Sequence, residues 1–104
     1  MMDIVFQVEG FEWDEWNITK NWEKHRVSHF ECEEIFLNEP LIIRKDEKHS
    51  QMETRYFVSG KTNNNRLLSL AFTIRNNKIR VIMARDMTRK ESQTYAKVER
   101  NTKV

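Results

Sequence analysis

Several arginines of this 104-residue chain fall inside segments with the alternating pattern of β-strands. Arg75, Arg80 and Arg85 lie in or beside two such segments, which flank the pair Asn76-Asn77. The guanidinium group is planar and carries five N–H donors, so an arginine fixed on a sheet can hold a phosphate group in a defined geometry. A flexible basic tail cannot do this. These positions favour contact with a polyanion such as a nucleic acid.

Charge is divided unevenly along the chain. Residues 1–53 have a formal balance of −7 and residues 54–104 a balance of +9, although the whole chain carries only +2. A basic half joined to an acidic half is typical of a molecule with a polyanion-binding surface on one side. The alternative is an ordinary solvated surface, because 33% of the residues are charged.

The composition predicts one folded domain over residues 1–104, since the chain has three Trp, six Phe and two Tyr. No apolar run is long enough to span a membrane, and the first residues lack the basic leader and apolar run of a signal peptide. Cys32 is the single cysteine and cannot form an internal disulfide. We therefore expect a cytoplasmic protein without a membrane association. With two glycines, the chain has no glycine-rich phosphate loop.

The elements that must position these arginines can be predicted from start signals and periodicity. Helices are expected from Asp14 to about residue 25, from Ser28 to about residue 37, and from Thr88 onward, the last two opened by capping boxes. The last helix has few apolar residues, essentially Tyr95 and Val98 with a neighbouring alanine, so it needs a partner or docks loosely. Residues 4–8 and 11–13 are expected to form a short strand or hairpin.

Beyond residue 40 the apolar period changes to two, which predicts strands over 41–44, 54–59, 66–74 and 78–84. Asn76-Asn77 suits a tight hairpin turn because asparagine tolerates a positive φ. The expected fold is α+β, with two N-terminal helices packed on an antiparallel sheet, plus a C-terminal helix.

Pairing the last two strands across Asn76-Asn77 sorts their side chains by face. The core face is predicted to hold the pairs Ile74–Ile79, Phe72–Val81 and Leu70–Met83. The outer face is predicted to hold Arg75, Thr73, Arg80, Ala71, Ile82, Ser69 and Ala84. Arg85 has the parity of the core face.

The positions of Glu53 and Arg55 stay open. A six-residue turn after the strand over 54–59 places both on the core face, as a buried pair opposite Leu70 and Phe72. A one-residue bulge places them beside Arg80 instead.

A set of short motifs spans about residues 11–95 in a definite order. They are Phe11-Glu-Trp-Asp14, Asn21-x-x-Lys-His-x-Val-Ser28, Asp46-x-x-His-Ser-x-x-Glu-x-Arg55, Gly60, Arg66-Leu-Leu68, Phe72-Thr-x-Arg75, Ile79-Arg-Val-Ile82, Ala84-Arg85, and Glu91 with Tyr95. In these motifs the chain resembles the BrnT-type ribonuclease toxins of bacterial type II toxin–antitoxin systems. It departs from their pattern at Asn17, where Lys is usual, and at His29 and Met83.

The resemblance implies a RelE-like fold and an endoribonuclease that inhibits translation and growth. It also implies a cognate antitoxin of the ribbon–helix–helix type, which neutralises the toxin and binds operator DNA on behalf of both proteins. The thin C-terminal helix and the arginine face are where such a partner could dock. Two alternatives remain open: a non-catalytic nucleic-acid-binding module, or a protein-interaction module whose basic residues form ion pairs with the acidic half.

Metal-free RNA cleavage needs a base for the 2′-hydroxyl, a proton for the leaving 5′-oxygen and positive charge at the transition state. The candidate catalytic residues are Lys24, His25, Glu53, Arg55, Arg75 and Arg80, with His49 a weaker candidate. Arg66 and Arg85 are candidate RNA contacts. His25 could instead be a favourable partner of a helix dipole, and Arg85 could form a structural salt bridge. No cofactor is expected, and a zinc site at His25, His29 and Cys32 is disfavoured because a helix ends and restarts between them.

Overall fold

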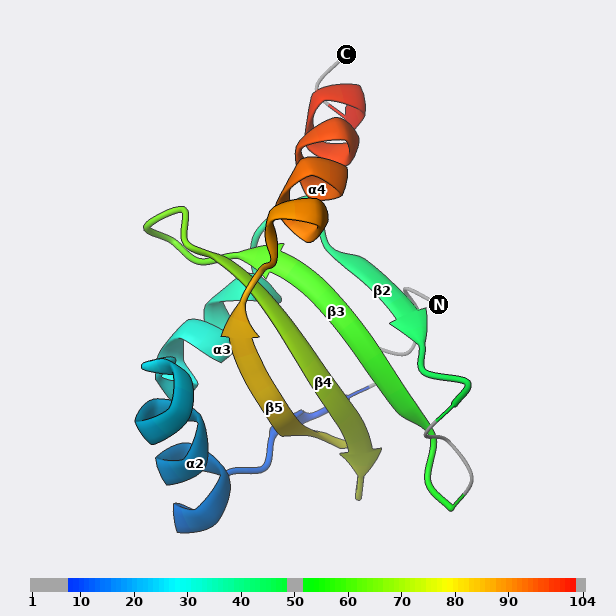
Figure 1. The fold of residues 1–104 in the computed structure, drawn as a ribbon. Coiled ribbons are helices and arrows are strands. Elements are labelled where there is room, and N and C mark those ends of the chain that lie inside the picture. The colour runs from blue at the N-terminus through cyan, green and yellow to red at the C-terminus, as the bar shows by residue number, and fades with distance from the viewer. Residues whose placement is uncertain (1–7, 49–51, 103–104) are drawn as a thin grey trace.

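The computed structural model describes residues 8–48 and 52–102, which form three helices and a five-stranded sheet (Figure 1). In chain order these elements are β1 (Gly10–Phe11), α2 (Glu15–His25), α3 (His29–Ile35), β2 (Ile42–Lys45), β3 (Arg55–Lys61), β4 (Leu67–Arg75), β5 (Lys78–Asp86) and α4 (Arg89–Thr102). The predicted α+β class is confirmed. The four long strands lie within one or two residues of their predicted ends, and α3 ends two residues early. No helix among the described residues is long and apolar enough to cross a bilayer.

The sheet is mixed rather than purely antiparallel. Its strand order is β1-β5-β4-β3-β2, and β2 to β5 form an antiparallel meander. The short strand β1 instead runs parallel to β5, with Gly10 opposite Lys78 and Phe11 opposite Ile79. The prediction of an antiparallel sheet is therefore wrong at this edge, whereas β1 agrees with the expected short initial strand. Residues 4–7 of the predicted first strand lie outside the described residues.

The three predicted helix starts are confirmed. Asp14 caps α2, its side chain accepting from the Asn17 N–H at 2.9 Å while the Asn17 side chain accepts from the Asp14 N–H at 2.8 Å. Ser28 and Glu31 form the same reciprocal pair before α3. Such boxes satisfy N–H groups that have no partner inside the helix.

One face of the sheet is covered by α3, which lies behind the strands in Figure 1, whereas α2 lies beside the edge of β5. Val27, Cys32 and Ile35 pack there against strand residues that include Leu70 and Phe72, and all five are fully buried. The opposite face carries no helix over its middle, and α4 projects from the end of the sheet (Figure 1). We call this second face the outer face.

Polar side chains of α2 close the edge of β5 beyond the short strand β1. Asn17 Nδ2 donates to the Val81 carbonyl oxygen at 3.4 Å and Lys20 Nζ to that of Ile82 at 3.0 Å. Asn21 Oδ1 accepts from the Ala84 N–H at 3.1 Å. These bonds satisfy backbone groups that an open strand edge leaves unpaired. Asn17, where the resemblance implies Lys, thus has a capping and edge-binding role.

A β-bulge in β5 changes which residues face the core. Phe72 pairs with Val81 as predicted, but Ala71 pairs with Met83 and Leu70 with Ala84, so Ile82 is the extra residue. Beyond the bulge the side-chain parity is reversed. Ala84 is consequently fully buried in the core.

The bulge corrects several predictions made from unbroken alternation. The pair Leu70–Met83 does not form, Ala84 does not lie on the outer face, and Met83 and Arg85 have the parity of the outer face rather than the core face. The predicted hairpin turn is confirmed, with positive φ values of 52° at Asn76 and 62° at Asn77.

Candidate nucleic-acid interface

The predicted site residues form two groups at opposite ends of β5. Arg80 and Arg85 are five residues apart along the strand, which is roughly 16 Å at about 3.3 Å per residue. The first group, which we call the turn-end cluster, comprises Glu53, Arg55, Arg75 and Arg80. The second, which we call the helix-end cluster, comprises Lys24, His25, Arg66 and Arg85. His49 lies outside the described residues.

Glu53 and Arg75 form a bidentate ion pair in the turn-end cluster. Arg75 Nε donates to Glu53 Oε2 at 2.8 Å and Nη2 to Oε1 at 3.0 Å. The bonds from Arg75, assisted by the charge of Arg80, lower the pKa of Glu53, and Glu53 in turn raises the pKa of Arg75. In this arrangement Glu53 is an ionised acceptor and a weak base.

Arg80 is held by two carboxylates from the segment that leads into α2. Its Nη1 donates to Glu12 Oε1 at 3.2 Å and its Nη2 to Asp14 Oδ2 at 2.8 Å. The pKa of Asp14 is lowered, first by the backbone N–H of Asn17 and then by Arg80. Sequence reasoning missed Glu12 and Asp14 as partners, because about 65 residues separate them from Arg80.

The register of β3 decides where Arg55 lies. Lys61 pairs with Leu67, so the β3–β4 connection is residues 62–66, and Arg55 lies opposite Thr73. Thr73 also pairs with Arg80. Arg55 and Arg80 therefore flank Thr73 on the outer face, which resolves the open alternatives in favour of the position beside Arg80. Arg55 Nε lies 3.4 Å from Asp46 Oδ2.

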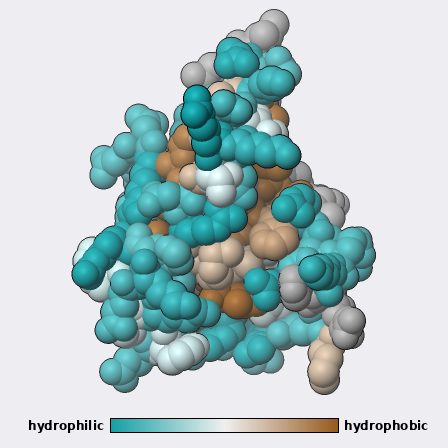
Figure 2. All heavy atoms as spheres, viewed as in Figure 1, coloured by the Kyte–Doolittle hydropathy of each residue, from teal (hydrophilic) through white to brown (hydrophobic). Residues whose placement is uncertain are grey.

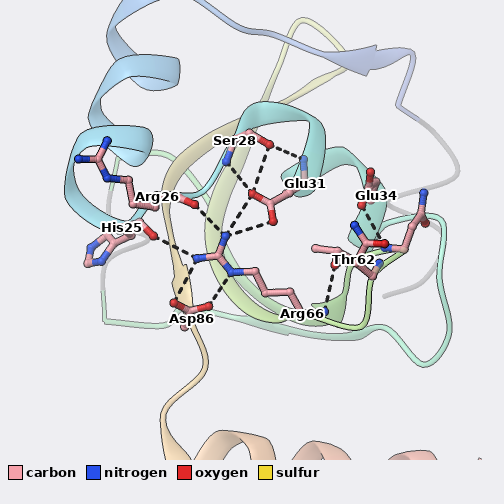
Figure 3. Close-up of polar contacts among 10 residues, drawn as sticks. His25, Arg26, Ser28, Glu31, Glu34, Thr62, Arg66 and Asp86 are labelled. Carbon is pink, nitrogen blue, oxygen red and sulfur yellow. Dashed lines mark hydrogen bonds and ion pairs between the residues drawn. The ribbon is translucent and has the colours of Figure 1, made fainter.

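Arg66 is the centre of the helix-end cluster (Figure 3). Its guanidinium binds both Asp86 oxygens at 2.7 and 3.2 Å, Glu31 at 3.1 Å, and the carbonyl oxygens of Arg26 and His25 at 2.7 and 3.1 Å. Asp86 and Glu31 raise the pKa of Arg66, and Arg66 lowers that of Asp86. All five N–H groups have acceptors, so a contact with RNA would have to displace one of them.

Lys24 and His25 occupy the exposed last turn of α2. In Figure 3 the His25 carbonyl oxygen points toward Arg66, whereas the imidazole ring points away from it. The charge of His25 contributes to lowering the pKa of Asp86. Both side chains are thus accessible, but they belong to the end of β5 that lies away from Arg80.

Arg85 links the sheet to the first turn of α4. It donates from both Nη atoms to the Glu91 carboxylate, at 2.7 and 3.1 Å, and Ser69 Oγ donates to the same group at 3.0 Å. Glu91 also accepts from the Thr88 N–H in the predicted capping box. These bonds, chiefly those from Arg85, lower the pKa of Glu91 to about 2. The salt-bridge alternative for Arg85 is what the structure shows, and its contact with RNA stays a prediction.

Between the two clusters the outer face has a small hollow. Arg44, Phe57, Ser69 and Arg85 are among the residues that line it, and the Arg44 guanidinium lies 4.5 Å from the centre of the Phe57 ring. Figure 2 shows less polar residues gathered in the middle of this view, over β3 and β4, with hydrophilic residues around them. Arginine and aromatic side chains of this kind are surfaces on which nucleic-acid bases stack. Sequence reasoning missed Arg44 and Phe57.

Cys32 and His29, which together with His25 are the disfavoured zinc ligands, lie in a buried position and in an aromatic cluster, respectively. Cys32 is buried, and its burial raises the pKa of the thiol to about 12. The His29 ring lies 5.6 Å from that of Trp13 and 4.1 Å from that of Phe30. Across residues 8–48 and 52–102, no group of three or more His, Cys, Asp or Glu is placed to hold a metal ion.

The model of a family described as "Ribonuclease toxin, BrnT, of type II toxin-antitoxin system" matches residues 13–91. None of the curated proteins compared with the chain matches it. The matched segment includes both clusters and ends in the first turn of α4.

Proposed function

Since this chain belongs to the BrnT family of ribonuclease toxins from type II toxin–antitoxin systems, we propose that it is an endoribonuclease that cleaves RNA without a metal ion. Its α+β architecture is then of the RelE-like type and the whole chain is one toxin domain. Cleavage inhibits translation and growth, and a cognate antitoxin neutralises it.

The turn-end cluster supports this proposal most directly. Arg55 and Arg80 lie in one row across the outer face, and Arg75 and Lys78 occupy the next row on that face at the turn. Arg80 is oriented by Glu12 and Asp14, so its donors are fixed before substrate arrives. Fixed positive charge at the place where negative charge develops is the largest contribution in many enzymes. The negative charge here develops on a phosphorane-like transition state.

Glu53 is the proposed base. An RNA phosphate that binds Arg75 competes with Glu53 for the same donors. When Glu53 loses its bonds from Arg75, its pKa rises again toward the ordinary value. Glu53 then accepts the 2′-hydroxyl proton while the 2′-oxygen bonds to phosphorus and the bond to the 5′-oxygen breaks. The departing 5′-oxygen takes a proton from water, and the hydroxide formed removes the proton from Glu53. The products are a 2′,3′-cyclic phosphate and a 5′-hydroxyl.

Lys24 and His25 are proposed to act on the same RNA strand at a distance from the scissile phosphate, because they belong to the other end of β5. Arg66 and Arg85 have their donors engaged by carboxylates, so their contribution is first to hold the helix-end cluster together. An antitoxin of the ribbon–helix–helix type that covers the outer face would block both clusters at once. Operator DNA is then reached only through the antitoxin.

A double substitution tests the catalytic assignment. Arg75→Ala/Arg80→Ala removes two donors, each worth about a hundredfold in rate, or on the order of 3 kcal/mol. Induced expression of this variant should leave cells growing, while the purified protein keeps its cooperative thermal transition. Lys45→Ala is the control. Lys45 is an exposed cation on β2, and it shares the core side of the sheet with Tyr56, its cross-strand neighbour, so it lies away from the outer face. Growth arrest by the double variant at the parent's strength would contradict the assignment.

A second candidate function has its own support. Four arginines of the basic half, at 55, 66, 75 and 80, bind carboxylates of the acidic half. This is the arrangement expected of a protein-interaction module whose basic residues form ion pairs with the acidic half. A purified protein that neither binds nor cuts single-stranded RNA, and is harmless without an antitoxin, would favour this function over the ribonuclease.

A further inference from the structure

Helix α4 has one side fixed to the sheet. Tyr95 is buried, and its hydroxyl donates to the Pro40 carbonyl oxygen at 2.6 Å. Glu91 binds Arg85 and Ser69, and Glu99 pairs with Lys61. Glu91, Tyr95 and Glu99 are spaced four residues apart, so they form one side of the helix. The remainder of α4 projects beyond the sheet (Figure 1).

The other side of α4 presents a row of polar and cationic residues. Lys90, Gln93, Lys97 and Arg100 are spaced three or four residues apart, and all four are exposed. We call this row the α4 stripe. Its members line one open hollow along the helix, together with Thr94 and Ala96. At 1.5 Å per residue the stripe is about 15 Å long, the length occupied by about four phosphates of one stacked strand.

The cations of the α4 stripe differ from the arginines of the sheet. Each sheet arginine in the two clusters is bound to at least one carboxylate, which cancels much of its field. Within the described part of the chain, by contrast, Lys90, Lys97 and Arg100 form no ion pair with a carboxylate. The positive charge of the stripe is therefore available to a polyanion at no cost in broken ion pairs.

The composition of the stripe favours RNA over a protein as its partner. A helix that docks in a protein groove uses apolar anchors three to four residues apart, and Ala96 is the sole apolar residue along this hollow. Lysine, arginine and glutamine are, in contrast, donors to phosphate and sugar oxygens. The stripe also begins at Lys90, beside the Glu91–Arg85 link that borders the hollow of the outer face.

We propose that the α4 stripe binds the phosphate backbone of single-stranded RNA and holds the strand where it reaches the outer face. This inference rests on the proposed function for the identity of the substrate. The stripe is an additional binding surface, because two of its cations, Lys97 and Arg100, lie beyond the segment matched by the family.

The test is a charge-matched pair of triple variants. Lys90→Gln/Lys97→Gln/Arg100→Gln removes the cations of the stripe, and Arg26→Gln/Lys45→Gln/Lys48→Gln removes three exposed cations elsewhere. The probe is a fluorescein-labelled, 2′-O-methylated oligouridine, which has no 2′-hydroxyl to attack. Its dissociation constant is measured over a range of salt concentrations. Three lost phosphate contacts should lower the log–log salt slope by about 2, at about 0.7 per contact, and weaken binding at least tenfold. The control variant should keep the parent's slope.

Three results would overturn the inference: an unchanged slope in the stripe variant, an equal fall in both variants, or unchanged RNA binding with loss of binding to the cognate antitoxin. Cleavage of unmodified RNA is measured in parallel. A stripe variant with normal cleavage at saturating RNA but weak binding supports the inference fully. If the parent protein binds the probe through the stripe but cuts no RNA, the proposed ribonuclease function is contradicted and the inferred binding surface is supported.

Discussion

Arg66 and Arg80 both form ion pairs, but the two sets of ion pairs differ in how much they stabilise the fold. Arg80 is held by two carboxylates that are themselves partly exposed, 35% for the Glu12 side chain and 48% for that of Asp14. Pairs of this kind contribute little to stability because water can replace either partner. Arg66, in contrast, joins the end of α2, the start of α3 and the end of β5 (Figure 3). Under the proposed function, Arg80 can therefore leave its carboxylates for a substrate phosphate, whereas Arg66 holds elements of the fold together.

This difference predicts the stability of two variants. Arg66→Ala should lower the free energy of unfolding by about 2–3 kcal/mol, because two carboxylates and two carbonyl oxygens lose a charged donor. Arg80→Ala should lower it by less than about 1 kcal/mol. Urea unfolding followed by tryptophan fluorescence measures both. Equal losses in the two variants would show that Arg80 is also a structural residue.

At the scale of elements, α2 closes one edge of the sheet, since its polar side chains bind the backbone of β5. Asn21 is buried, and its side chain bonds to both elements: it donates to the Asn17 carbonyl oxygen in α2 and accepts from the Ala84 N–H in β5. Ala84 lies just beyond the bulge, where no strand among the described residues pairs with β5 on that side. The helix and the bulge therefore stabilise one another and set the direction of Arg85.

Asn21→Ala should destabilise the protein by about 1–3 kcal/mol, because it leaves the buried Ala84 N–H without its acceptor. Thr19→Ala, on the exposed side of the same helix, serves as the control and should change stability by less than about 0.5 kcal/mol. Thermal and urea unfolding of the two variants give the comparison. A loss in Asn21→Ala no larger than in Thr19→Ala would mean that the edge bond contributes nothing.

Glu91 gives the docking of α4 a dependence on pH. Its pKa is about 2 in the folded protein, against an ordinary value of 4.5. A lowered folded-state pKa means that ionised Glu91 stabilises the fold above pH 4.5, and that this contribution is lost as the pH falls through about 2. Glu91→Gln should therefore be less stable by about 1–2 kcal/mol at neutral pH.

The same variant should lose less stability than the parent on acidification between those two pH values. Unfolding free energies measured over this range test the difference, with the exposed Glu23→Gln as the control. Parallel pH profiles for Glu91→Gln and the parent would contradict the assigned role of Glu91.

At the scale of the whole molecule, the uneven charges of the two halves are largely used within the fold. Arg75 with Glu53 and Arg80 with Asp14 each join a basic residue to an acidic one from the other half. Under the proposed function, the positive charge available to RNA then includes the α4 stripe and those sheet arginines that the substrate can draw away from their carboxylates. The large difference in charge between the two halves of the sequence therefore becomes a smaller difference in charge between regions of the folded surface.

The proposed mechanism predicts that cleavage persists in excess chelator, because it assigns the positive charge needed at the transition state to arginine side chains. The product should carry a 2′,3′-cyclic phosphate or its hydrolysis product. Incubation of purified protein with labelled RNA and chelator, followed by analysis of the RNA ends, measures both. Loss of cleavage on chelation, restored by a divalent ion, would contradict the arginine-based mechanism.

The sequence alone determined the features that depend on near neighbours along the chain. The capping pairs at Asp14, Ser28 and Thr88 join residues three apart, and the turn at Asn76-Asn77 depends on two adjacent φ angles. Strand alternation likewise follows from the period of the apolar residues. Each of these could be predicted because its energy is set within a few residues.

Only the tertiary structure decided which charges meet and which faces they occupy. The bulge at Ile82 reverses the parity of Arg85, the connection over residues 62–66 brings Arg55 to the outer face, and β1 pairs in parallel with β5. Glu12 and Asp14 reach Arg80 across more than 60 residues. Register and ion pairing are settled by contacts between distant segments, so a shift of one residue moves a side chain to the other face while leaving the local pattern unchanged.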